Sequence, residues 1–142
     1  MPYNGDPALV RPVEDAKASL DRLRAAGLRV GVLSNQSGVA RGMITSDQVR
    51  AVNARIEELL GPFDGWYICE HGPGEDCECR KPKPKLVNDA ARDWNIAPSR
   101  IALIGDKRSD IETADNAGSQ GFLVGGHGLS LAQAVDRILV VA

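Results

Sequence analysis

Apolar residues follow helical and strand spacing alternately along the chain. Helical spacing together with cap residues predicts helices over residues 13–26, from 45 to 60, over 85–94, over 109–117 and from Leu131 onward. Short apolar runs predict strands over residues 28–33, 66–68, 101–104 and 121–124. The clearest helix start is Thr45 with Gln48 three residues later, a capping-box pattern, and Gly61-Pro62 ends that helix.

This alternation of strands with helices predicts an α/β fold with a parallel sheet covered on both faces. Ligands of such sheets bind at the carboxyl ends of the strands. We find no internal repeat and no linker rich in Gly, Ser or Pro, so one domain over residues 1–142 is expected.

The composition of the chain limits the kinds of partner that it is expected to bind. The chain has 17 basic and 19 acidic residues, for a formal charge of -2, and only two each of Phe, Tyr and Trp. These values give no broad attraction to nucleic acid and no base-stacking platform. Neither an export signal nor a run of about 18 apolar residues is present. A soluble, cytoplasmic, monomeric protein without membrane or nucleic-acid partners is therefore expected.

All three cysteines fall within one short segment that also contains a histidine. The ligand candidates are Cys69, His71, Cys77 and Cys79. Three thiolates and one imidazole form a ligand set typical of a closed, structural zinc site, with no position left for water. The alternative is three incidental thiols beside a surface histidine, which the clustering of every cysteine disfavours.

Polar residues follow two of the predicted strands. After residues 101–104 come Asp106, a candidate Mg²⁺ ligand, and Lys107, which can contact a phosphate. The alternative for this pair is a turn leading into an N-cap. Asp110 either supports the metal ligand Asp106 without contacting the metal, or stabilises the N-terminus of the next helix through the helix dipole.

The run Ser34-Asn35-Gln36-Ser37-Gly38 offers hydroxyl, amide and backbone donors for a phosphoryl group, or is an ordinary polar loop. Arg80-Lys81-Pro82 follows the cysteine segment directly, so a bound metal would fix two cations in place. The alternative for the basic pair is a solvated surface. His127 is expected to be only a loop residue.

In this order, these motifs resemble those of the haloacid dehalogenase superfamily, in particular its branch of D-glycero-D-manno-heptose bisphosphate and histidinol-phosphate phosphatases. The resemblance covers nearly the whole chain and implies a Rossmann-like three-layer sandwich with a zinc-binding loop. It rests on Leu33-Ser34-Asn35-Gln36-Ser37-Gly38-Val39-Ala40-Arg41-Gly42, on the Cys-x-His-x5-Cys-x-Cys loop running into Arg80-Lys81-Pro82, and on Ile104-Gly105-Asp106-Lys107.

The resemblance also implies roles for individual residues and two metal cofactors. Ser34 and Lys81 would stabilise the transferring phosphoryl group, while the substrate would also contact Asn35, Gln36, Ser37, Arg80 and Lys107. Asp106 would bind Mg²⁺, with Asp110 as a second candidate, and Zn²⁺ would bind Cys69, His71, Cys77 and Cys79. The implied substrate is a small sugar phosphate, first of all D-glycero-D-manno-heptose 1,7-bisphosphate, with histidinol phosphate as the alternative.

One motif of the family is missing. Its first strand ends in Asp-x-Asp, whose aspartates act as nucleophile and as general acid and base, and this sequence contains no Asp-x-Asp. The first, central strand is therefore expected to be lacking, which would leave two inner strand edges unpaired. Two hypotheses follow: a phosphatase whose first strand lies outside this sequence, or a non-catalytic, zinc-stabilised module that binds phosphorylated ligands. A zinc-dependent nucleic-acid binder is a third, which the acidic balance disfavours.

Overall fold

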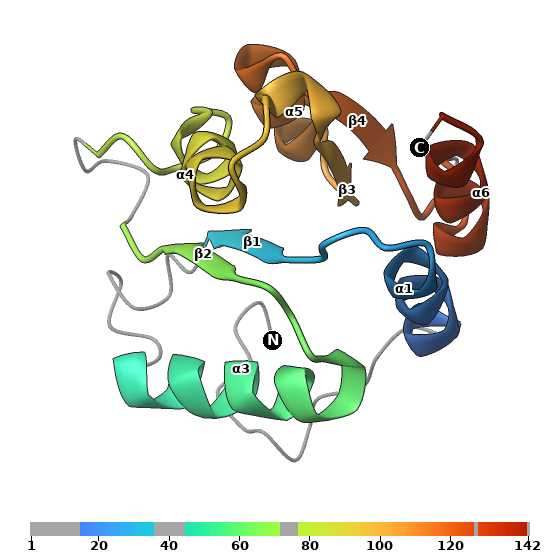
Figure 1. Cartoon of the computed structure of the whole chain (residues 1–142). Coiled ribbons are helices and arrows are strands. Elements are labelled where there is room, and N and C mark those ends of the chain that lie inside the picture. Colours follow the sequence, from blue (N-terminus) through green and yellow to red (C-terminus); the bar gives the residue numbers. More distant parts are fainter. Residues whose placement is uncertain (1–14, 36–44, 72–76, 127, 142) are drawn as a thin grey trace.

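The computed structural model describes residues 15–35, 45–71, 77–126 and 128–141. Helices and strands alternate along them, as the sequence predicts (Figure 1). In chain order the elements are α1 (Ala16–Ala25), β1 (Val32–Asn35), α3 (Ser46–Leu60), β2 (Trp66–Cys69), α4 (Lys85–Trp94), η2 (Pro98–Arg100), β3 (Ala102–Gly105), α5 (Arg108–Ala117), β4 (Gln120–Leu123) and α6 (Leu131–Val141).

The strands of the described ranges form two parallel pairs. β1 pairs with β2, with Val32 opposite Trp66, and β3 pairs with β4, with Ala102 opposite Gln120. No described strand joins β1 to β3, so these residues form two separate two-stranded sheets. This division agrees with the expected lack of a central strand, and the parallel pairing confirms the predicted α/β class.

Helices cover the strands on both sides (Figure 1). β3 needs cover on both sides because its side chains alternate between the two faces of the sheet. Leu103 packs with Val87 of α4 and Ala114 of α5. Its neighbours Ala102 and Ile104 instead pack against a cluster formed by residues of α1 and α6 together with Val30. The result is the three-layer arrangement that the sequence predicts.

The predicted strand over residues 28–33 is displaced in the structure. β1 spans Val32–Asn35, so Ser34 lies inside the strand rather than in the loop after it. The preceding residues have other partners: Leu28 N donates to Leu23 O, closing the end of α1, and the Val30 amide donates to the Asp64 carboxylate. These bonds replace a regular ladder, and the apolar pattern alone does not reveal them.

α3 begins as its sequence predicts. Gln48 N donates to Thr45 Oγ1 and Thr45 N donates to Gln48 Oε1, at 3.0 and 2.8 Å, which completes the capping box. No helix of the described ranges is long and apolar enough to cross a bilayer.

The turn between α3 and β2 is organised by one carboxylate. Glu57 accepts hydrogen bonds from Phe63 N at 2.8 Å and from Trp66 Nε1 at 3.2 Å. We expect Glu57→Ala to lower the free energy of unfolding by about 2 kcal/mol, because two hydrogen bonds to a charged, partly buried acceptor are lost. Urea titration measures the change. The control is Glu58→Ala, since the Glu58 side chain is 69% exposed and pairs with Arg55 at the surface. Equal losses for the two variants would contradict the prediction.

Candidate active site and metal centre

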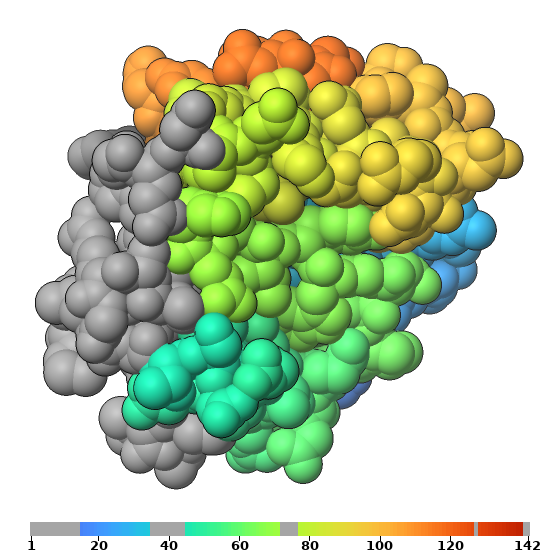
Figure 2. Space-filling model, turned by 90° about the vertical axis from the view of Figure 1, so that its left-hand side faces the viewer, coloured from blue at the N-terminus to red at the C-terminus, as the bar shows by residue number. Residues whose placement is uncertain are grey.

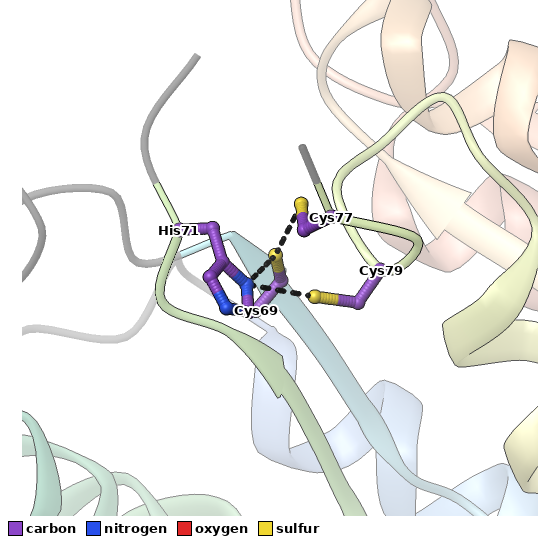
Figure 3. A group of neighbouring side chains, drawn as sticks. All are labelled: Cys69, His71, Cys77 and Cys79. Carbon is purple, nitrogen blue, oxygen red and sulfur yellow. Dashed lines mark hydrogen bonds between the residues drawn. The ribbon is translucent and has the colours of Figure 1, made fainter. Parts of the chain in front are cut away.

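The four predicted zinc ligands converge on one point (Figure 3). Their ligand atoms all lie within 4.8 Å of one another, although the residues come from the end of β2 and from the segment before α4. Cys69 Sγ lies 3.8 Å from Cys77 Sγ, and His71 Nδ1 lies 3.4 Å from Cys69 Sγ and 3.2 Å from Cys79 Sγ. The imidazole therefore turns its Nδ1 toward the sulfurs.

These separations fit a tetrahedral zinc ion. Zn–S bonds of about 2.3 Å place two ligand sulfurs about 3.8 Å apart, and a nitrogen ligand lies somewhat closer to each sulfur. The separations of Cys69 from Cys77 and of His71 from both Cys69 and Cys79 match these values, within a cluster that spans up to 4.8 Å. Four protein ligands fill the coordination sphere, so zinc held here would stabilise the loop and would not activate water.

Proton binding at the thiols opposes metal binding. Burial raises the pKa of the Cys79 thiol to about 12, and the nearby sulfurs of Cys69 and Cys77 add to the rise. For Cys77, burial also acts to raise the pKa, but hydrogen bonds from the backbone of Arg80 and from Cys69 and Cys79 outweigh it, and its pKa is lowered. Zinc must displace the protons that remain, so its affinity should rise with pH.

The cysteine loop leads directly into the two predicted substrate-binding cations. Arg80 Nη1 donates to the His71 carbonyl at 3.3 Å, and Lys83 Nζ donates to the Cys77 carbonyl. The backbone of the zinc ligands therefore holds residues 80–83, here called the basic segment, from one side. This supports the expectation that metal binding and the position of Arg80 and Lys81 are linked.

Lys81 forms a buried ion pair with Asp110 at the start of α5. Its Nζ lies 2.5 Å from Asp110 Oδ1, and the two side chains are only 14% and 7% exposed. Asp110 Oδ2 also accepts a hydrogen bond from Lys107 N at 3.2 Å. Both carboxylate oxygens are thus engaged, one with the helix cap and one with Lys81.

The close packing at this point explains Gly105. A Cβ at residue 105 would lie 2.2 Å from Asp110 Oδ2, so only glycine fits beside this carboxylate. Asp110 thereby lies against the end of β3, next to the loop that carries Asp106 and Lys107. The structure thus brings Lys81 and Asp110 to the carboxyl end of β3, where the sequence predicts a phosphoryl site.

Asp106 and Lys107 are exposed at this end of β3. A carboxylate in that place suits Mg²⁺, which prefers oxygen ligands. Among the described residues, however, the only group of three or more potential ligands is the Cys/His cluster. Asp106 therefore contributes a single carboxylate among the described residues, and its role as a Mg²⁺ ligand stays a prediction.

The predicted substrate residues are only partly described. Ser34 lies in β1 and is partly buried. Gln36, Ser37 and His127 fall outside the described residues, as does the side chain of Asn35. The roles assigned to these side chains stay predictions.

Sequence reasoning missed several residues that support the site. Ser46 Oγ, at the start of α3, donates to Glu70 between the zinc ligands at 3.0 Å. Figure 2 shows the start of α3 on the same face as β2 and α4. Asn116 Nδ2 donates to the Pro82 carbonyl at 2.9 Å. These contacts join residues far apart in sequence, and no local pattern indicates them.

The model of one protein family matches residues 5–118, with the description haloacid dehalogenase-like hydrolase. The chain belongs to this family. One similar protein is the D-glycero-beta-D-manno-heptose-1,7-bisphosphate 7-phosphatase of Pseudomonas putida, which is 35% identical over 80% of this chain and 67% of its own length. The protein of the same name from Rhodopseudomonas palustris is 33% identical over 97% of this chain and 82% of its own length.

A solved crystal structure matches the fold. It is the D,D-heptose 1.7-bisphosphate phosphatase from B. bronchiseptica complexed with magnesium and phosphate, with a TM-score of 0.88 and 27% identity over 99% of this chain and 90% of that one. The predicted family and branch are thereby confirmed. The phosphatase names of these relatives also confirm the prediction of a phosphomonoester hydrolase family.

Proposed function

We propose that this protein takes part in hydrolysis of a sugar phosphate, with D-glycero-D-manno-heptose 1,7-bisphosphate as the first candidate. The observation that carries the proposal is the buried Lys81–Asp110 pair at the end of β3, beside the loop of Asp106 and Lys107. Phosphoryl transfer depends mainly on positioning and on cations around a spreading negative charge. The names of the relatives support the choice of heptose bisphosphate over histidinol phosphate.

Each residue would contribute a separate part of the chemistry. Lys81 would neutralise charge on the transferring phosphoryl group, because Asp110 holds its ammonium in one place. The Ser34 hydroxyl would donate a hydrogen bond to the same group, and Arg80 would bind an oxygen-rich part of the substrate with its planar guanidinium. Asp106 would hold Mg²⁺, which would neutralise phosphoryl oxygens when bound.

A covalent route needs two further carboxyl groups. One attacks phosphorus and the other gives a proton to the leaving alcohol and later takes one from water. The sequence contains no Asp-x-Asp to supply them. We propose that a strand between β1 and β3, carrying these acids at its carboxyl end, completes the active form of the protein.

Activity tests this proposal. An extended protein, with an apolar strand ending in Asp-x-Asp placed before Met1, should release phosphate from heptose bisphosphate when Mg²⁺ is present. In that protein, Lys81→Met should lower kcat about 10²- to 10³-fold, because a charge-stabilising group is lost. Lys85→Met is the control, since Lys85 is half-exposed on α4 and pairs with Asp89. A folded, zinc-loaded extended protein without activity would contradict the proposed function.

The absence of Asp-x-Asp favours a second candidate, a zinc-stabilised module that binds a phosphorylated ligand without cleaving it. The same cations serve this function, since binding needs no nucleophile. The chain as given should then unfold cooperatively and bind sugar phosphate in calorimetry. Binding together with an inactive extended protein would select this candidate over the phosphatase.

A further inference from the structure

The backbone that carries Lys81 is held from two directions. On one side are the contacts to the zinc loop described above, together with a turn in which Lys83 N donates to Arg80 O at 2.9 Å. On the other side is α5. These contacts act on the main chain around Lys81 and are separate from the ion pair at its ammonium.

α5 contacts this segment at two points. Asp110, in the first turn, bonds the Lys81 ammonium, and Asn116, near the other end, bonds the carbonyl of Pro82 at 2.9 Å. Six residues of helix separate the two points by about 9 Å along the axis. The backbone that follows Lys81 is thus held beside Asn116, and the Lys81 ammonium is held at the start of the helix.

This arrangement gives Asn116 a function that Asp110 cannot provide. The long stem of a lysine is flexible, so an ion pair alone fixes the ammonium without fixing the direction from which the stem approaches. The Asn116 amide fixes the origin of that stem by holding the next peptide group. With both ends held, the ammonium loses fewer conformations when it meets a phosphoryl oxygen.

We propose that Asn116 is a positioning residue for Lys81, which aligns the ammonium with the phosphoryl group of the ligand. The inference rests on the proposed function, in which Lys81 binds that group. Asn116 itself does not touch the substrate in this scheme. Its side chain is exposed on α5, so its loss should leave the core intact.

Calorimetry with inorganic phosphate tests this on the zinc-loaded chain as given. Asn116→Ala should weaken phosphate binding about two- to tenfold, the range expected for one lost hydrogen bond. Asn116→Gln, which keeps the amide donor, should recover part of the affinity. The matched control is Asn53→Ala, the same change on α3, which lies on the opposite side of β1 from α5 in Figure 1 and should leave binding unchanged.

The ammonium signal of Lys81 in ¹⁵N NMR spectra provides a readout that does not depend on phosphate. The chemical shift of this signal should change in Asn116→Ala and stay the same in Asn53→Ala. Unchanged phosphate affinity in Asn116→Ala would overturn the role of Asn116. If the unmodified chain binds no phosphate, the binding-module candidate is contradicted, and the phosphatase is judged by the activity of the extended protein. The Lys81 signal then decides on Asn116: no shift on its replacement would overturn the inference.

Discussion

Replacing Cys77 with serine is expected to abolish tight zinc binding and to loosen the segment that carries Arg80 and Lys81. Cys77 is buried and its sulfur is one corner of the ligand cluster. Structural zinc sites contribute about 10 to 16 kcal/mol of binding free energy, so losing one of four ligands removes a large share of it. Metal analysis of the purified variant should find far less than one zinc per chain. Its thermal unfolding midpoint should fall to that of the unmodified protein treated with a chelator.

The control is Glu78→Gln, which changes the exposed residue between Cys77 and Cys79 and keeps all four ligands. It should retain zinc and unfold at the normal temperature. Full zinc content in Cys77→Ser would contradict the four-ligand assignment. Normal stability after complete zinc removal would show that the loop folds without the metal.

Replacing Asp110 with asparagine is expected to lower the free energy of unfolding by about 3 kcal/mol, because the buried Lys81 ammonium loses its carboxylate partner. Asparagine has nearly the same shape and can still accept the hydrogen bond from Lys107 N. The loss should therefore come from charge and not from packing. Chemical denaturation measures it, and the double variant Lys81→Met with Asp110→Asn should recover most of the stability, since no buried charge remains.

A carboxylate with exposed cationic partners provides the comparison. Asp89→Asn removes the partner of Lys85 and Arg92, whose side chains are 46% and 73% exposed, and should cost less than about 1 kcal/mol because both cations stay hydrated. Similar losses for Asp89→Asn and Asp110→Asn would show that burial does not set the strength of the Lys81–Asp110 pair. A double variant as unstable as Asp110→Asn would show that the unpaired ammonium is not the cause.

Local chemistry made much of the fold predictable. α4 spans the predicted residues 85–94, and Thr45 and Gln48 form the expected capping box. Prediction failed where tertiary contacts decide a boundary, as at β1, because the Asp64 side chain bonds the backbone of Val30. A strand begins where its neighbour can pair with it, and apolar spacing contains no information on that register.

In the candidate site, too, local chemistry could be predicted from the sequence and tertiary contacts could not. Four soft ligands in one short segment indicate zinc by their chemistry, before any geometry is known. The sequence left two roles open for Asp110, support of a metal ligand or stabilisation of a helix start. In the structure Asp110 caps α5 and also bonds Lys81. Asn116 acts through the backbone carbonyl of Pro82, 34 residues earlier in the sequence, so nothing in its own neighbourhood indicates this contact.

The separation of the described strands into two pairs has a consequence for how the molecule opens. Within each pair the backbone bonds form and break together. Between β1 and β3 the described residues are joined by side-chain packing, for example of Leu33 against the cluster of Val87, Leu103 and Ala114. Local opening can therefore begin between the two strand pairs, before the chain as a whole unfolds. The basic segment lies at the boundary, tied through Cys77 to one pair and through α5 to the other, and a ligand that binds Lys81 would therefore stabilise both at once.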